Sequence, residues 1–199
     1  ELGYVNHETI RGLFMTITNA NFDADAIENE IRTLLDLRDD LRSEALKKDP
    51  NAKFSDAAEF TAGTREEMLE KTASIGVLST ENEDIRSLRQ LITYGVKGMA
   101  AYAEHAANLG CEDPEIVSFM FKALAAIKDD SLSTEELTAL ALETGKYGVK
   151  VMALLDGANT SRFGNPEISH VSIGVRSNPA ILISGHDLND LEQLLEQTQ

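Results

Sequence analysis

An internal repeat is the feature that most restricts how this chain can fold. A stretch at the start of the chain aligns without gaps on a stretch near its middle. Each copy is followed by an Asp-containing turn and a second amphipathic helix, beginning near Asp23 and Ser133. Self-similarity of this kind indicates one structural unit used twice. The matched positions are Glu1-Leu-Gly3 with Asn108-Leu-Gly110, and Glu8, Ile10, Phe14 and Ile17 with Glu115, Val117, Phe121 and Leu124.

The repeated unit is predicted to be a three-helix bundle. In the second copy a long helix, about residues 82–108, precedes the Leu-Gly turn, whereas in the first copy the chain starts at that turn. The first bundle is therefore expected to lack its leading helix. The predicted divisions of the helical part, residues 1–156, are a partial first bundle at 1–48, a linker at 49–79 and a second bundle at 80–156.

Short capping motifs predict where the helices start. Thr64, Thr80 and Ser133 each stand three residues before a Glu, which is the spacing of a capping box. Asp113-Pro114 combines a capping carboxylate with a proline at the first helical position. Apolar residues with helical spacing lie between these starts, so each helix should bury one face. They are Ile27, Ile31, Leu34, Leu41 and Ala45 in one segment, and Ile85, Leu88, Ile92, Met99 and Ala103 in another.

Glycines recur inside two of the predicted helices. The string Tyr94-Gly-Val-Lys-Gly-Met99 returns nearly intact as Tyr147-Gly-Val-Lys-Val-Met152. A glycine in a helix costs about 1 kcal/mol relative to alanine. We therefore expect these glycines to mark close packing between helices.

The pattern changes after Gly157. Two short β-branched runs, at 171–175 and 180–183, are separated by a turn composition and followed by a helix expected at 187–197. Residues 157–199 are thus predicted to start an α/β domain. The whole prediction is a mainly α chain: two three-helix bundles, the first without its leading helix, and then the first strands and helix of a truncated α/β Rossmann-like domain.

Composition disfavours several classes of partner. The formal net charge of −16 argues against binding to nucleic acid or to an anionic membrane surface, because both require clustered Lys and Arg. The sequence also has no apolar run of about eighteen residues and no signal sequence, so a cytoplasmic location is expected. The single cysteine, Cys111, excludes an intrachain disulfide and an all-cysteine metal site built from this segment alone.

His186 is the candidate site residue. It directly follows the predicted strand at 180–183, where Gly185 permits a tight turn and Asp187 is expected to cap the next helix. In open α/β sheets, ligands bind at the carboxyl ends of the strands. An imidazole at that place can be a metal ligand or a proton donor. The alternative is a histidine that is merely hydrogen-bonded at a domain surface, and placement alone leaves both readings open.

The other histidines have weaker cases. We expect His7, His105 and His170 to have surface or interface roles. The four histidines show no metal-ligand spacing such as His-Glu-x-x-His, so any metal must take further ligands from elsewhere.

Several uncommon strings together resemble one family. The chain is similar over nearly its whole length to the hybrid cluster (prismane) proteins of the hydroxylamine reductase family, and it looks like an internal fragment of one. The strings are Leu88-Arg-Gln-Leu-Ile-Thr-Tyr-Gly-Val-Lys-Gly-Met-Ala-Ala-Tyr-Ala-Glu-His105, Leu142-Glu-Thr-Gly-Lys-Tyr-Gly-Val-Lys150, Asn159-Thr160, Gly164-Asn-Pro-Glu167 and residues 178–198.

The resemblance implies a parent enzyme that reduces hydroxylamine to ammonia and water, with nitric oxide reduction as a possible role in the cell. Such a parent carries a hybrid iron–sulfur–oxygen cluster and a second cluster, 4Fe-4S or 2Fe-2S, and receives electrons from a donor protein. The family's histidine ligand belongs to the Ser-Gly-His-Asp-Leu string, so His186 inherits that role. The remaining ligands have no matching position here, and the isolated chain is expected to hold no cluster and to be inactive.

Two other readings compete. A nickel–iron carbon monoxide dehydrogenase resembles the same architecture and would be recognised by its own cysteine pattern. A non-catalytic helical interaction module would need only the acidic surface and the repeated bundles.

Overall fold

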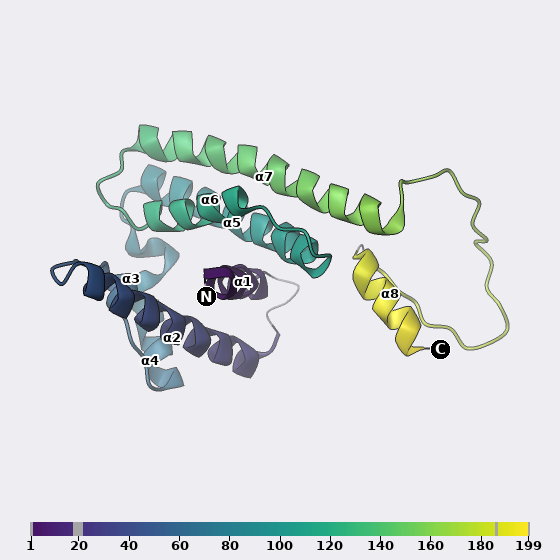
Figure 1. Ribbon diagram of the computed structural model, residues 1–199, viewed down its shortest axis with the longest axis horizontal. Helices are drawn as coiled ribbons and strands as arrows, with labels where there is room; N and C mark the ends of the chain where they lie inside the picture. Colours follow the sequence, from purple (N-terminus) through teal and green to yellow (C-terminus); the bar gives the residue numbers. More distant parts are fainter. Residues whose placement is uncertain (1, 18–21, 186, 199) are drawn as a thin grey trace.

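The computed structural model describes residues 2–17, 22–185 and 187–198, and in these parts it is helical (Figure 1). The short helices are α3 and the 3-10 helix η1. The elements in order are α1 Leu2–Met15, α2 Ala24–Lys48, α3 Asp56–Glu59, α4 Arg65–Ile75, η1 Val77–Ser79, α5 Glu83–Asn108, α6 Pro114–Ala126, α7 Thr134–Phe163 and α8 Leu188–Gln197.

The core lies where four helices meet. Helices α5, α6 and α7 pack together as a three-helix bundle, α1 packs against α5, and α2 packs against α1 (Figure 1). The predicted mainly α fold is confirmed. The buried core residues come from α1, α5, α6 and α7, and they are Ile10, Ile92, Val96, Met99, Ala100, Ala103, Ile116, Phe119, Met120, Ala123, Leu137, Leu140 and Val151.

Most of the predicted helix starts are confirmed. Thr64 and Ser133 form complete capping boxes at α4 and α7, and Asp113 caps α6 ahead of its proline. The prediction at Thr80 is wrong, because Asn82 is the N-cap of α5 and its side chain accepts hydrogen bonds from two backbone amides. Asn is among the strongest N-cap residues, so it sets the start of this helix.

The two copies of the repeat differ at the Leu-Gly turn. In the second copy Gly110 has a φ of +77°, a left-handed conformation that ends α5. In the first copy Gly3 lies inside α1, so the turn predicted there is not formed.

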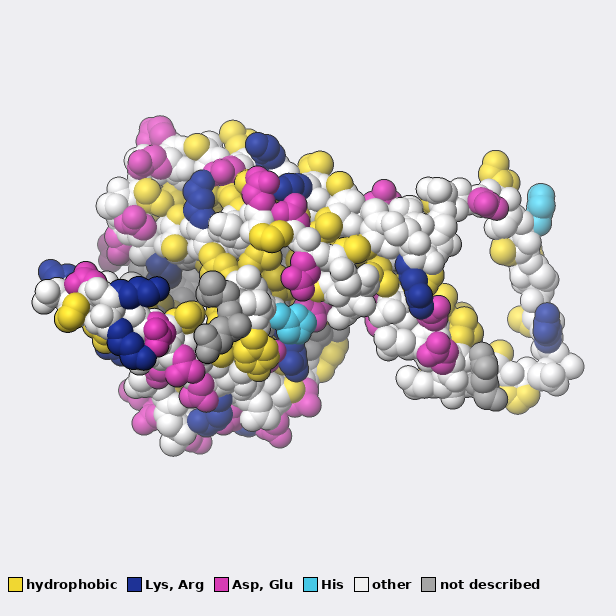
Figure 2. All heavy atoms as spheres, in the orientation of Figure 1, with side chains coloured by type: hydrophobic (Ala, Val, Ile, Leu, Met, Phe, Trp, Pro, Cys, Tyr) yellow, Lys and Arg dark blue, Asp and Glu magenta, His cyan; other side chains and the backbone are white. Residues whose placement is uncertain are grey.

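The strands predicted at 171–175 and 180–183 are absent from the described residues, and so is the Rossmann-like part. The chain between α7 and α8 is exposed and irregular, and its apolar side chains are spaced along it (Figure 2). Ile173 and Leu182 are 98% and 96% exposed. A strand requires a partner strand for its backbone hydrogen bonds. No described segment supplies that partner, so β-branched composition alone does not produce a strand.

Candidate functional site

Helix α8 begins immediately after the candidate ligand. His186 itself lies outside the described residues. Asp187 is the N-cap of α8, as predicted, and its Oδ1 accepts hydrogen bonds from the amides of Asn189 at 2.8 Å and Asp190 at 3.1 Å. These bonds satisfy amides that would otherwise lack a partner at the helix start. They also fix the residue that follows His186 in the chain.

The second carboxylate oxygen of Asp187 contacts helix α5. Its Oδ2 forms a close ion pair with Nδ1 of His105, and both side chains are largely buried. On the α1 side, the Phe14 ring packs edge-on against the His105 ring, with 5.4 Å between ring centroids. His105 thus has the interface role expected for it. The sequence did not predict that its partner is Asp187.

A small cavity lies beside this contact. It has a volume of about 30 Å³, which is enough for one or two water molecules. Helices α5 and α7 meet the start of α8 here. The cavity is lined by Tyr102, His105, Leu109, Leu155, Asn159 and Asp187.

Within the described part of the chain, helix α8 has one further polar attachment to the bundle. Arg162, in the last turn of α7, donates a hydrogen bond to Glu192 at 2.9 Å. Both side chains are substantially exposed, so this pair contributes little stability. Among the described residues, the partly buried contact between His105 and Asp187 is therefore the main polar link between α8 and the bundle.

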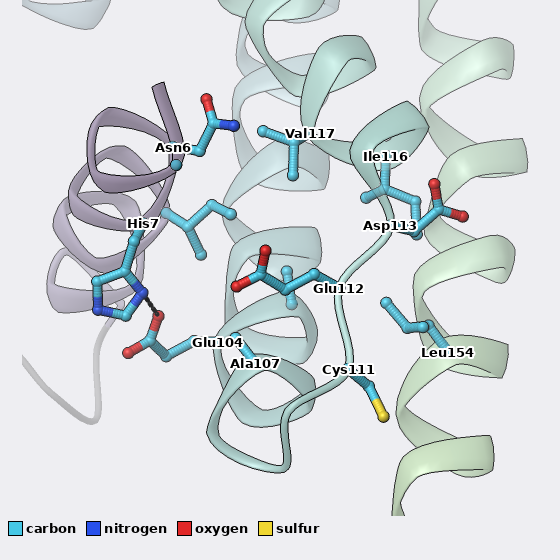
Figure 3. Close-up of a pocket in the computed structure, with 13 residues that line it drawn as sticks. Asn6, His7, Glu104, Ala107, Cys111, Glu112, Asp113, Ile116, Val117 and Leu154 are labelled. Atoms are coloured by element: carbon cyan, nitrogen blue, oxygen red, sulfur yellow. Dashed lines mark ion pairs between the residues drawn. The ribbon is translucent and has the colours of Figure 1, made fainter. Parts of the chain in front are cut away.

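A second cavity, of about 20 Å³, lies between α1, α5 and α7. The His7 ring and the Glu104 carboxylate point toward one another across it, and the segment carrying Cys111 and Glu112 borders it (Figure 3). The distance from His7 Nδ1 to Glu104 Oε2 is 3.9 Å, which is too long for a hydrogen bond. Within the described ranges, no group of three or more His, Cys, Asp or Glu side chains is arranged to hold a metal ion.

The family model described as Prismane/CO dehydrogenase family matches residues 3–199. The chain belongs to this family. Relatives named hydroxylamine reductase agree with the resemblance seen in the sequence. The protein from Acetivibrio thermocellus is 66% identical over the whole chain, and the protein from Clostridium perfringens is 60% identical over 98% of it. The protein from Desulfitobacterium hafniense is 58% identical over the whole chain.

The match covers only part of these family members. The chain spans 36% of the length of the first two relatives and 37% of the third. Within the described residues, no helix combines the length and the apolar character needed to cross a membrane.

Proposed function

We propose that the chain is part of a hybrid cluster protein that reduces hydroxylamine to ammonia and water. The observation that carries this proposal is the 66% identity, along the full chain, to a relative named hydroxylamine reductase. In this reaction a pair of electrons and a pair of protons cleave the N–O bond. The electrons would come from a donor protein. Nitric oxide is the second candidate substrate in the cell.

His186 is the residue that we assign to the hybrid iron–sulfur–oxygen cluster. Its position next to the capped start of α8 supports the assignment, because Asp187 is held both by backbone amides and by His105. An imidazole is a suitable ligand for iron. The described residues do not form a cluster site by themselves, since Cys111 is the only cysteine. Most ligands of the hybrid cluster, and all of those for the second cluster, would come from outside this chain.

In this proposal the described residues hold the site in place and do not themselves react with the substrate. Asp187 and His105 fix the start of α8 against α5, and a small cavity lined in part by Asn159 and Tyr102 lies beside it. A bound iron–sulfur cluster with an open iron position would supply electrons and a binding place for a small nitrogen oxide.

Carbon monoxide dehydrogenase is the alternative, because the matching family model covers that class too. The names of the relatives favour hydroxylamine reductase. Assays of hydroxylamine reduction and of carbon monoxide oxidation on the same cluster-loaded protein would separate the two activities.

The test uses the protein expressed anaerobically from the complete gene. Iron content, the visible spectrum and the electron paramagnetic resonance spectrum are compared between the parent, His186→Ala and His170→Ala. His170 is the matched control, because it lies exposed in the irregular segment before α8. We expect His186→Ala alone to lose the hybrid-cluster signal. An unchanged signal in His186→Ala would overturn the ligand assignment, and a parent without iron would overturn the proposed function.

The chain of 199 residues on its own gives a second test. We expect it to retain no stoichiometric iron after anaerobic purification and to show no reductase activity. Stoichiometric iron in this chain would show that it holds a cluster without further ligands.

A further inference from the structure

Two glutamates are buried against each other where α1 packs on α2. Glu8 on α1 is 5% exposed and Glu30 on α2 is 7% exposed. The helices come close here because of Gly12, where an added Cβ would lie 2.9 Å from Leu34 Cδ1 and 3.5 Å from Glu30 Oε1. The two carboxyl groups are therefore removed from water at a tight helix crossing.

The charges that face this pair do not neutralise it. From α1, Arg11 lies 3.6 Å from Glu8 Oε2 and 3.9 Å from Glu30 Oε2, and its side chain is half exposed. From α5, the buried Glu104 adds a third carboxylate, and His7 lies 3.9 Å from it. Arg11 thus faces both acids of the pair, while His7 is shared with a third acid, Glu104.

One carboxyl oxygen of the pair lacks a hydrogen-bond donor among the described residues, which indicates that the pair binds a proton. Glu30 Oε1 is fully buried and receives no hydrogen bond from any donor in the described residues. A protonated carboxyl has no such deficit, since it can donate its own hydrogen to the neighbouring carboxylate. Burial raises the pKa of Glu30 above its ordinary value of 4.5, and the negative charge of Glu8 and a carboxyl hydrogen bond with Glu8 raise it further.

We propose that Glu8 and Glu30 share one proton, and that release of this proton to solvent weakens the packing of α2 on α1. With the proton bound, the neutral carboxyl of one side chain donates a hydrogen bond to the carboxylate of the other across the helix crossing. Without it, two carboxylates face each other in a site that excludes water, and their repulsion separates the helices. The device is independent of the cluster chemistry proposed above.

The second copy of the repeat supports this reading. Glu30 stands seven residues after the N-cap Asp23, and Leu140 stands seven residues after the N-cap Ser133. Leu140 is also 7% exposed and lies in the core. The same place in the helix is thus occupied by an apolar side chain in one copy and by an acid in the other. A neutral, protonated Glu30 is the form that matches a buried leucine.

The direction of the pH effect follows from the raised pKa of Glu30. The folded protein binds this proton more tightly than the unfolded chain does. The stability that the pair contributes is therefore full below the ordinary glutamate pKa of 4.5, and it is lost as the pH rises through the raised pKa of the folded state.

The test measures protonation and helix position separately on the full chain. Infrared difference spectra report the C=O stretch of a protonated carboxyl as the pH is raised above 4.5. Pulsed electron paramagnetic resonance, with spin labels at Tyr4→Cys and Asp36→Cys in a Cys111→Ser background, reports the distance between α1 and α2. The variants are Glu30→Gln, Glu8→Gln and the control Glu28→Gln, which changes an acid outside the pair on the same helix.

We expect a protonated-carboxyl band in the parent that disappears as the α1–α2 distance lengthens. Glu30→Gln should lose this band, and its α1–α2 distance should no longer depend on pH. Glu8→Gln should keep the band but lose it at a lower pH than the parent, because the negative charge of Glu8 no longer raises the pKa of Glu30. Glu28→Gln should keep both signals of the parent. The proposal is overturned if the band survives in Glu30→Gln, if its loss occurs at the same pH in Glu8→Gln as in the parent, or if the distance in the parent is constant while the band is lost. Glu30→Gln and Glu8→Gln change different helices. If one of these variants fails to fold, the other still tests the proposal.

Discussion

The backbone of Gly95 on α5 lies so close to Thr144 on α7 that a Cβ added to Gly95 would stand 2.6 Å from the Thr144 methyl carbon. Thr144 is buried, and its hydroxyl donates a hydrogen bond to the carbonyl of Leu140 at 2.8 Å, so its side chain is held in place. Close helix packing, expected from the repeated glycine string, is confirmed at this position. The prediction is wrong at Gly98 and Gly148, which have open space where a Cβ would be.

Gly95→Ala should therefore destabilise the chain, whereas Gly98→Ala should not. Overpacking a buried contact costs about 1–3 kcal/mol, and it opposes a gain of about 1 kcal/mol in helix propensity. At Gly98 only the gain applies. Urea unfolding followed by circular dichroism measures both variants. Equal stabilisation of the two would show that α5 and α7 can separate at Gly95 without cost.

The capping box of α7 gives a second prediction. The Ser133 hydroxyl accepts a hydrogen bond from the Glu136 amide, and the Glu136 carboxylate accepts one from the Ser133 amide. Ser133→Ala should lower the free energy of unfolding by about 1 kcal/mol. Thr138→Ala, an exposed change on the same helix, should stay within about 0.5 kcal/mol of the parent. Thermal unfolding of both variants tests this prediction. Similar melting temperatures would mean that the capping box does not stabilise the fold.

Glu28 gives an acid-side pH dependence. Hydrogen bonds from Arg32 and then from Arg65 hold the pKa of Glu28 below its ordinary value of 4.5. Its contribution to stability is therefore present above pH 4.5 and is lost as the pH falls through the lowered pKa of the folded state. Glu28→Gln should flatten this part of the stability curve. Urea unfolding at a series of acidic pH values tests it, with Glu66→Gln as an exposed control from the first turn of α4. The same slope in parent and Glu28→Gln would count against the assignment.

The irregular segment between α7 and α8 should promote self-association. Its apolar side chains are exposed, and unpaired β-branched segments pair readily with other chains. Sedimentation velocity at increasing concentration should show oligomers in the parent. The double variant Ile173→Lys and Leu182→Lys should remain monomeric, and Leu69→Lys, at an exposed leucine on α4, should still associate. A parent that stays monomeric at all concentrations would refute the prediction.

Local signals predicted much of the helical part. A capping box is completed within four residues, so Thr64 and Ser133 could be recognised from sequence. The start of α5 was predicted wrongly at Thr80, because the helix is capped two residues later by Asn82. The prediction of strands was wrong for a different reason. Their composition is local, but their hydrogen bonds require partner strands that the described residues do not provide.

The sequence did not predict the contact of His105 with Asp187 or that of Glu8 with Glu30. Nothing in the spacing of His105 and Asp187 indicates that they meet, although each lies in a string that resembles the family. Glu30 follows Ile27 by three residues and could have been recognised as lying on the apolar face of its helix. Its burial against Glu8 depends on how α1 crosses α2. The assignment of His186 remains a proposal, because that residue lies outside the described part of the chain.

Helix α8 is attached by one partly buried contact, His105 with Asp187, and one exposed ion pair, Arg162 with Glu192, and this has a kinetic consequence. Helix α8 has no fully buried residue, and the irregular segment joins it covalently to the end of α7. A coil of that length has a root-mean-square end-to-end distance of about 25 Å. When the contact between His105 and Asp187 breaks, α8 therefore stays near its docking place at an effective concentration of the order of millimolar. Weak contacts are then enough for α8 to dock again. The start of α8 can therefore dissociate and rebind many times while the bundle remains folded.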